Sequence, residues 1–505
     1  MTVTYLTTTI PYVNARPHLG FALELVQADV LARHGRQRGH EIRLLTGTDD
    51  NSLKNVLAAE AEGIPTQELV DRNADAFAAL RGPLALSFDD FIRTSRDPRH
   101  RPGVERFWRA CADSGDLYRK HYEGLYCVGC EQFYVASELR DGRCPEHDRR
   151  PQVVAEENWF FRLSRYQERL YDLISSGRLR IEPAGRRNEV LSFIAAGLDD
   201  FSVSRSRNRA RGWGIPVPDG GDQVIYVWWD ALGNYLTALD YGEDGPAYEH
   251  WWLHGDRRVH LLGKGVVRFH AVYWPAMLLS AGVPLPTELF VHDYLTVDGN
   301  KISKSSGTAV DPVTLVERFG TDAVRWWLLR EVPRVGDADF TVDKLIATTN
   351  RDLANDLGNL VHRVVSMLHR YRDGRPVTGS ETTPGAQALA AARREAAGQV
   401  DAALSNFDFR RAAAAIWSIV EEANRYVEIA QPWQLARAER DGHASAASQL
   451  DAALAVLIGA CRDLAEHLAP FLPDAAARIT AQCTSVDGRL PAAQPLFPRG
   501  DQAGW

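Results

Sequence analysis

The chain has 505 residues, of which 45% are hydrophobic and 25% charged, and its formal net charge is −8 with a pI of about 6.0. This ordinary globular composition spread over such a length exceeds what one hydrophobic core can organise, so about two to four domains are expected. Six cysteines do not make a disulfide scaffold, and no apolar run reaches the roughly 18 residues of a membrane span. The acidic balance excludes a protein whose whole surface coats nucleic acid, although a local basic face could still bind RNA.

The N-terminal part of the chain predicts a strand, a helix and a second strand. Residues 3–10 (VTYLTTTI) alternate as a strand does, and residues 11–20 form a turn marked by Pro and Gly. Residues 21–39 carry apolar side chains at helical spacing and end at a glycine, and residues 41–47 (EIRLLTG) read as the second strand. This unit predicts the start of a parallel sheet. The first residues have neither the basic region nor the apolar stretch of a signal peptide, so a cytoplasmic protein is expected.

Further along the chain the pattern changes at about residues 116, 221 and 346. A short-stranded, cysteine-bearing segment looks like an insertion, the α/β pattern then resumes, and the last part is almost wholly helical. We therefore expect an α/β Rossmann-type domain and a C-terminal α-helical bundle. The expected division is a Rossmann-type domain split between 1–115 and 221–292, a connective insertion at 116–220, a connecting region at 293–345 and a helical domain at 346–505.

Two short stretches could bind phosphate. In PHLG, His18 could donate a hydrogen bond to a phosphate, and Gly20 opens the helix N-terminus, whose N–H groups carry partial positive charge. In DGNKISKSSG, Lys301 and Lys304 stand among small residues, which would let the loop move onto a polyphosphate. Each stretch also has a plain interpretation, because a helix-start histidine can simply pack and a Lys-Ser-Gly loop can be a solvated turn.

Cysteine spacing predicts a metal site in the insertion. CVGC is followed by CPEH, which gives a set of three thiolates and one imidazole: Cys127, Cys130, Cys144 and His147. The spacing fits tetrahedral Zn²⁺, and four protein ligands make such a site closed and structural. A disulfide is the alternative, and it disagrees with the expected reducing compartment.

Polar residues at two other places could bind ligands. Asp49 in TGTDD follows the second strand, at the carboxyl end where α/β folds bind ligands, and it could hold an ammonium or merely cap a turn. Asn359 and Arg363 lie four residues apart on one face of a helix and, with Trp433 stacking on a base, could read exposed bases. The alternative is a surface polar pair and a buried aromatic side chain.

Together and in this order, these segments resemble the class I aminoacyl-tRNA synthetases, and among them the methionyl-tRNA synthetase family. The resemblance runs from about residue 4 to about residue 470. PHLGF looks like the family's HIGH signature and KISKS like its KMSKS signature, and the cysteine knuckle lies in the expected insertion. YVWWDALGNYL and RFHAVYWPAM resemble the methionine-binding segments, while DLANDLGNLVHR and PW resemble the anticodon-reading segments.

The resemblance implies a two-step ligase that forms methionyl-adenylate from methionine and ATP and then transfers methionine to tRNA(Met). Lys304, assisted by Lys301, would stabilise the leaving pyrophosphate, and Mg²⁺ would accompany the ATP. His18, Gly20 and Phe21 would border the ATP. Asp49 would bind the α-ammonium of methionine, and Arg205 would assist near the phosphates unless its arginine run is a solvated strand edge.

The methionine side chain would lie in an aromatic-walled apolar site, which suits a thioether. By the resemblance this site is formed by Ile10, Tyr12, Trp228, Ala231, Leu232, Tyr235, Phe269, His270 and Trp274. Asn359, Arg363 and Trp433 would read the CAU anticodon. No editing domain and no separate C-terminal dimerisation domain is visible, so a monomer is expected.

Three positions depart from the family pattern. Phe21 replaces the second histidine of HIGH, Asn51 and Ser52 replace His and Gly of the strand-end motif, and Gly265 stands where an aspartate is usual. Phe21 cannot donate the hydrogen bonds of a histidine, so slower adenylation is expected. The departures leave two alternatives open: a paralogue that activates an amino acid for a non-tRNA acceptor, and an inactive RNA-binding protein.

Overall fold

The computed structural model describes residues 1–146, 148–218, 220–297, 299–301, 310–379 and 385–497. These residues form two compact units, one made of 1–81 and 86–293 and the other of 82–85 and 294–505. Within the described ranges, no helix is both long and apolar enough to cross a membrane.

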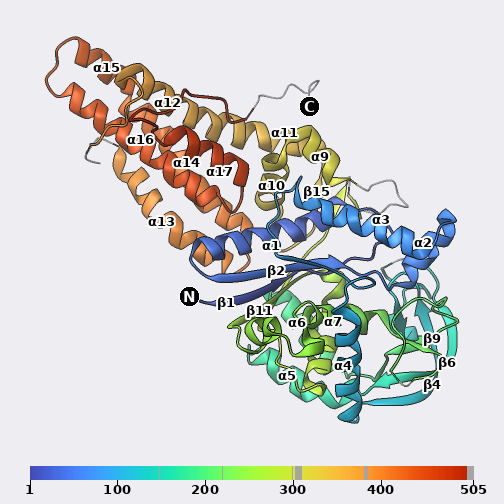
Figure 1. The fold of residues 1–505 in the computed structure, drawn as a ribbon. Helices are drawn as coiled ribbons and strands as arrows, with labels where there is room; N and C mark the ends of the chain where they lie inside the picture. Colours follow the sequence, from blue (N-terminus) through green and yellow to red (C-terminus); the bar gives the residue numbers. More distant parts are fainter. Residues whose placement is uncertain (147, 219, 298, 302–309, 380–384, 498–505) are drawn as a thin grey trace. The chain divides into compact units, whose positions relative to one another are not determined.

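The first unit is built on a parallel sheet that has six strands in the described part of the chain (Figure 1). Its order is β3-β2-β1-β11-β12-β7, and every neighbouring pair is parallel. Thr7 lies in register with Leu45 of β2 on one side and with His260 of β11 on the other. This is the doubly wound topology that places ligands at the carboxyl ends of the strands. The strands are β1 (Val3–Thr7), β2 (Glu41–Thr48), β3 (Asp90–Arg93), β7 (Arg180–Glu182), β11 (Arg257–Gly263) and β12 (Glu288–His292).

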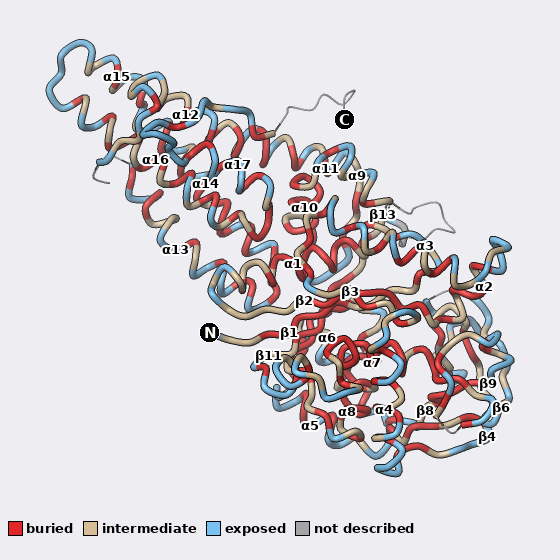
Figure 2. The backbone as a smooth tube through the Cα atoms, viewed as in Figure 1, coloured by how far each residue is buried: buried red, intermediate tan, exposed pale blue. Residues whose placement is uncertain are grey.

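Helices cover the sheet, and an aromatic core fills the space between the layers. Tyr5 and Leu45 of the sheet pack with Phe107, Trp229 and Trp274 from the helices, all nearly inaccessible to solvent. The inner strands β2, β1, β11 and β12 are buried along most of their length (Figure 2), whereas the edge strands β3 and β7 are mostly half-buried. The helices of this unit are α1 (Leu19–Gln37), α2 (Leu53–Glu62), α3 (Thr66–Ala78), α4 (His100–Asp113), α5 (Gln167–Ser175), α6 (Ala184–Ala195), α7 (Val227–Thr237) and α8 (Trp274–Ser280), with π-helical turns at Tyr248–Leu253 and Phe269–Tyr273.

The segment expected as an insertion forms a smaller antiparallel sheet and also contributes one strand to the main sheet. Its strand order is β5-β4-β6-β8, and a two-stranded ribbon β9-β10 lies nearby in the chain. Strand β7, inside the stretch expected as an insertion, pairs with β12 and becomes the edge of the main sheet. The strands are β4 (Leu117–Cys127), β5 (Gln132–Tyr134), β6 (Gln152–Phe161), β8 (Phe201–Ser202), β9 (Ser204–Ser206) and β10 (Gln223–Ile225).

The second unit joins a small sheet to a helical bundle. The buried Arg325 ties its parts together, because its guanidinium donates to the carbonyl groups of Leu84, Pro470 and Phe471. The expected helical character from about residue 346 agrees with this bundle. The elements are β13 (Leu295–Val297), β14 (Asn300–Lys301), β15 (Ala338–Phe340), α9 (Pro312–Phe319), α10 (Thr321–Arg330), α11 (Val342–Thr348), a π-helical segment Thr349–Gly358, α12 (Asn359–Arg372), α13 (Ala386–Leu404), α14 (Phe409–Ala430), α15 (Pro432–Arg440), α16 (Ala446–Leu468) and α17 (Pro473–Cys483).

Candidate active site and metal centre

Several predicted site residues follow directly on strands of the main sheet. Ile10 and Tyr12 come after β1, Asp49 comes after β2, and the backbones of Tyr12 and Asp49 form an isolated parallel bridge. Because the strands are parallel, these positions share the carboxyl edge of the sheet. The edge therefore gathers an acid and two apolar side chains from segments far apart in the chain.

The predicted methionine-binding side chains lie against one another in this unit. Trp228 stacks on Phe269 with ring centroids 3.7 Å apart and an interplanar angle of 7°, and Tyr12 meets Trp228 edge-on at 6.4 Å. Tyr235 contacts Trp274 at 5.9 Å. Between Trp228 and Tyr235 on the same helix α7 lie the buried Ala231 and Leu232, and Ile10 packs against the same hydrophobic cluster.

The histidines in this aromatic group are neutral. His270 Nδ1 lies 3.0 Å from the Val266 carbonyl, which can only accept, so this nitrogen carries the proton and Nε2 accepts from the Tyr235 hydroxyl at 2.8 Å. Burial lowers the pKa of His270 to about 4. Burial also holds the pKa of His260 well below its usual value, and its Nε2 accepts from the Trp274 indole at 3.2 Å. The group thus presents no positive charge to an amino acid.

Asp49 is a buried acid with few donors around it. Its side chain accepts one hydrogen bond among the described residues, from the Asn51 backbone N–H at 3.2 Å, and the residue is 2% exposed. Burial raises the pKa of Asp49 well above the ordinary value, and the nearby Asp230, Asp50 and Glu131 carboxylates raise it further. A cation placed here would relieve this unfavourable charge.

Two buried residues were not predicted from the sequence: Asp230, whose charge acts on Asp49, and His100, which contacts Asp230. Asp230 accepts from the Asn51 amide at 2.7 Å through one oxygen and contacts His100 Nε2 through the other, and His100 Nδ1 lies 2.8 Å from the Thr237 hydroxyl. The available signal was Asp230 itself, a single acid inside the apolar segment VWWDALGNYL. His100 carried no recognisable signal, because its partner lies 130 residues away.

Glu131, the residue after Cys130, is the centre of a second buried network. Its carboxylate accepts from Ser52 at 2.7 Å and from Arg205 at 2.9 Å, and also from Tyr126. Burial would raise the pKa of Glu131, but Arg205 and the two hydroxyl donors outweigh it and lower the pKa below the usual range. Arg205, expected near the phosphates, is 5% exposed and forms an ion pair with Glu131; the two residues lie 74 positions apart in the chain, so no local pattern predicted the pair.

At the start of α1, one of the backbone N–H groups that could bind phosphate is already bonded to a side chain. His18 is the N-cap, and its Nδ1 accepts from the Gly20 N–H at 3.1 Å, so in the neutral ring Nε2 is the donor nitrogen. Phe21 packs its ring edge-on against Phe77, with centroids 5.0 Å apart, in a small apolar cluster. The expected effect of Phe21 on adenylation stays a prediction.

A further buried pair joins α1 to the end of β12. His292 Nε2 lies 2.8 Å from Glu24 and its Nδ1 lies 2.9 Å from the Asp293 carbonyl. The Asp293 carbonyl and an ionised Glu24 both accept hydrogen bonds, an arrangement that favours a protonated ring; burial lowers the pKa of His292, but Glu24 more than compensates and raises it. Asp293 itself lies 3.8 Å from Lys264, beside the departure at Gly265. This pair was not foreseen from the sequence.

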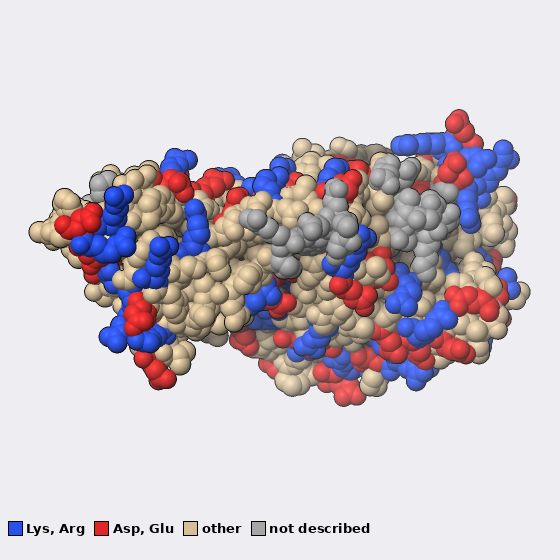
Figure 3. Space-filling view, turned by 90° about the horizontal axis from the view of Figure 1, so that it is seen from above, with Lys and Arg blue, Asp and Glu red and all other residues tan. Residues whose placement is uncertain are grey.

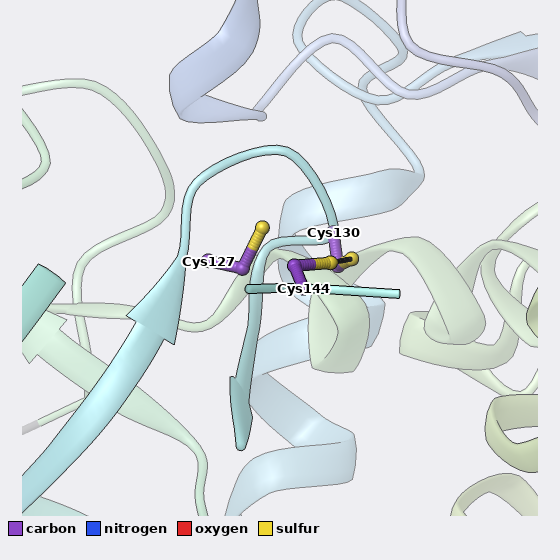
Figure 4. A group of neighbouring side chains, drawn as sticks. All are labelled: Cys127, Cys130 and Cys144. Carbon is purple, nitrogen blue, oxygen red and sulfur yellow. Dashed lines mark hydrogen bonds between the residues drawn. The ribbon is translucent and has the colours of Figure 1, made fainter. Parts of the chain in front are cut away.

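The cysteine knuckle brings three sulfur atoms together. Cys127 ends β4, and Cys130 lies at the other end of the loop that follows. Cys144 lies beside Cys130 (Figure 4). The three sulfur atoms are all within 4.8 Å of one another, and those of Cys130 and Cys144 are 3.3 Å apart. Such a group can hold a metal ion, and its soft donors suit a thiophilic one. The fourth predicted ligand, His147, lies outside the described residues.

Of the two lysines predicted to bind phosphate, Lys301 alone lies within the described residues. Lys301 ends the short strand β14, whose backbone pairs with β13. Lys304 lies outside the described residues.

The predicted anticodon residues lie on two helices of the second unit. Asn359 is the first residue of α12, and Arg363 on the same helix donates to Asn424 at 2.9 Å and to Glu428 at 3.2 Å. Trp433, in the first turn of α15, is 40% exposed, so the alternative interpretation of it as a buried aromatic side chain is wrong. On the face drawn in Figure 3, Lys and Arg side chains are interspersed with Asp and Glu side chains.

Comparison with known proteins gives matches along nearly the whole chain. The family model "tRNA synthetases class I (M)" matches residues 4–150 and 134–365, and the model "Anticodon binding domain of methionyl tRNA ligase" matches residues 376–496. The chain is 41% identical over 483 residues to the methionine–tRNA ligase of Mycobacterium bovis, covering 94% of this chain and 91% of that protein. It is 38% identical over 522 residues to the methionine–tRNA ligase of Brucella suis, covering 98% and 97%.

Among solved structures, the fold is similar to the methionyl-tRNA synthetase of Mycobacterium tuberculosis in complex with methionyl-adenylate. The TM-score is 0.93 with 38% sequence identity, and the match covers 99% of this chain and 100% of that one. The likeness extends through the parallel sheet, the cysteine-bearing region and the helical bundle, and it confirms the fold class expected from the sequence.

Proposed function

The chain belongs to the methionyl-tRNA synthetase family, and we propose that it activates L-methionine with ATP and transfers it to tRNA(Met). The observation that carries this function is Asp49: a buried acid, beside an aromatic group at the carboxyl edge of the sheet, with a raised pKa and one backbone donor. An amino acid supplies the matching cation in its α-ammonium and the matching apolar body in its side chain.

In the first step, a carboxylate oxygen of methionine attacks the α-phosphorus of ATP, and pyrophosphate leaves. Asp49 holds the α-ammonium, so the substrate carboxylate is turned toward the nucleotide. His18, as the N-cap of α1, offers the Nε2 proton to phosphate oxygen, and Lys301 and Lys304 stabilise the charge that develops on the pyrophosphate. Mg²⁺ bound with ATP would neutralise phosphate charge.

In the second step, a hydroxyl of the terminal adenosine of tRNA attacks the carbonyl carbon of the adenylate, and AMP leaves. The methionine side chain stays among Tyr12, Trp228 and Phe269, where sulfur–ring contact favours a thioether. The neutral state of His270, enforced by burial, keeps this site apolar.

We propose that the knuckle holds one Zn²⁺ through Cys127, Cys130, Cys144 and His147. When bound, the ion supplies a structural cross-link between the two halves of the knuckle. Metal analysis of the purified chain is expected to give about one equivalent of zinc. Cys144→Ser is expected to lose it, whereas Cys111→Ser, at a buried cysteine outside the group, should retain it. Zinc retained after Cys144→Ser would contradict the assignment.

Aminoacylation of a transcript tests the acceptor. The chain should charge a methionine tRNA transcript with labelled methionine, and a changed anticodon should abolish most of that charging. Trp433→Ala is expected to raise the KM for tRNA by roughly tenfold or more, the size of one lost base-stacking contact, without changing pyrophosphate exchange. Trp251→Ala, at a partly buried tryptophan of the first unit, is the control.

A ligase for a non-tRNA acceptor predicts a different outcome in the same assay. Such a protein would form the adenylate and charge neither transcript, and an inactive RNA-binding protein would bind tRNA without exchange. The match of the anticodon-binding model to residues 376–496 favours tRNA as the acceptor. We further propose that the chain acts as a monomer in the cytoplasm, where tRNA is charged.

A further inference from the structure

Asn51 contacts two buried carboxylates at once. Its backbone N–H donates to Asp49 Oδ1 at 3.2 Å, and its side-chain amide donates to Asp230 Oδ2 at 2.7 Å. The two acids are 2% and 1% exposed. They come from different segments, because Asp230 lies on α7 and Asp49 follows β2. Asn51 therefore links the two acids, one through its backbone and the other through its side chain.

The second acid is held through both of its oxygens. His100 contacts Asp230 Oδ1 while Asn51 donates to Oδ2, and the His100 ring is itself oriented by Thr237. Asp49, by contrast, has one backbone donor among the described residues. Of the two carboxylates, Asp49 is therefore the one better able to accept further hydrogen bonds from a ligand. The charge of Asp230 adds to the negative potential at Asp49.

We propose that Asn51 is a positioning residue for the amino-acid substrate. It fixes Asp230 relative to Asp49 and so sets how strongly Asp49 attracts the α-ammonium; this proposal rests on the proposed function. It also accounts for one departure from the family pattern. A histidine at this position could donate a ring N–H to the same carboxylate, and the asparagine amide provides that donor from a shorter side chain. The departure at Asn51 is then a replacement of one donor by another.

The test is ATP–pyrophosphate exchange as a function of methionine concentration. Asn51→Ala is expected to raise the methionine KM about tenfold, the size expected for one lost hydrogen bond to a charged group, with kcat within about threefold of the wild type. Asn51→His is expected to restore the KM to within about threefold, because it returns a donor. Asn188→Ala, at an exposed asparagine of α6, is the matched control and should leave the KM unchanged.

A purely structural role would lower kcat and thermal stability together and would not be rescued by histidine. An unchanged KM in Asn51→Ala, or a KM in Asn51→His as high as in the alanine variant, would overturn the proposal. Should Asn51→Ala fail to fold, Asn51→Leu fills a similar volume without a donor and should show the same rise in KM. A wild-type protein that lacks methionine-dependent exchange would instead overturn the proposed function itself.

Discussion

Asp49→Asn is expected to raise the methionine KM in ATP–pyrophosphate exchange roughly 100- to 1000-fold, the cost of removing one partner of a buried charge pair. Asparagine keeps the shape of the side chain and its contact with the Asn51 N–H, but it has no charge to pair with the α-ammonium. The measurement is exchange at several methionine concentrations. Asp75→Asn, at an exposed acid of α3, should behave as the wild type.

The pH dependence of the same assay follows from the raised pKa of Asp49. Burial and the neighbouring acids Asp230, Asp50 and Glu131 raise this pKa, so the carboxylate takes up a proton at a higher pH than an ordinary aspartate. Only the ionised form pairs with an ammonium, so the methionine KM should rise as the pH falls, and Asp49→Asn should remove this dependence. The same slope in both proteins would contradict the role of Asp49.

Arg205→Met is expected to lower the free energy of unfolding of the first unit by about 3–5 kcal/mol, because it leaves a buried charge without its partner. Arg205 lies 2.9 Å from Glu131, and the two side chains are 6% and 0% exposed. Glu131 also has a positive φ of 55°, a conformation that non-glycine residues rarely adopt, so its contacts must hold it in place. Urea unfolding followed by tryptophan fluorescence measures the change.

The control for this prediction lies in the turn that follows β9, the strand that carries Arg205. Arg211 pairs with Glu60 at 3.2 Å, but the side chains are 55% and 46% exposed, so Arg211→Met should cost about 1 kcal/mol or less. Adding Glu131→Gln to Arg205→Met should recover part of the loss by removing the unpaired charge. An equal decrease in the free energy of unfolding in the Arg205 and Arg211 variants would show that the buried ion pair stabilises the protein no more than the exposed one.

The sign of the pH effect on stability also follows. The pKa of Glu131 is lowered in the folded chain, against the effect of burial, mainly by Arg205 and the hydroxyl donors Tyr126 and Ser52. Its contribution to stability is therefore fully present above the unfolded glutamate pKa and is lost as the pH falls through the lowered folded value.

Short-range pattern was enough to predict much of the architecture. The strand expected at 3–10 is found as β1, which ends earlier at Thr7, the strand expected at 41–47 is β2, and the helix expected at 21–39 is α1, Leu19–Gln37. Side-chain periodicity and a glycine or cap at each end decide such elements locally. The Cys127, Cys130 and Cys144 group was predicted from another local pattern, the spacing of the cysteines along the chain. Strand β7 was not foreseen, because three residues are too few for a period.

The order of the motifs along the chain was enough to identify the family, and the motifs named Asp49 and the aromatic side chains as candidates for the amino-acid site. The partners of those residues became known from the folded structure alone. Asn51 meets Asp230 across 179 positions of the chain and Arg205 meets Glu131 across 74. Contacts at such separations follow from how the sheet and helices pack, and no local pattern encodes them. Asp49 could therefore be named from the sequence, but neither the buried acids around it nor the partners of those acids could be.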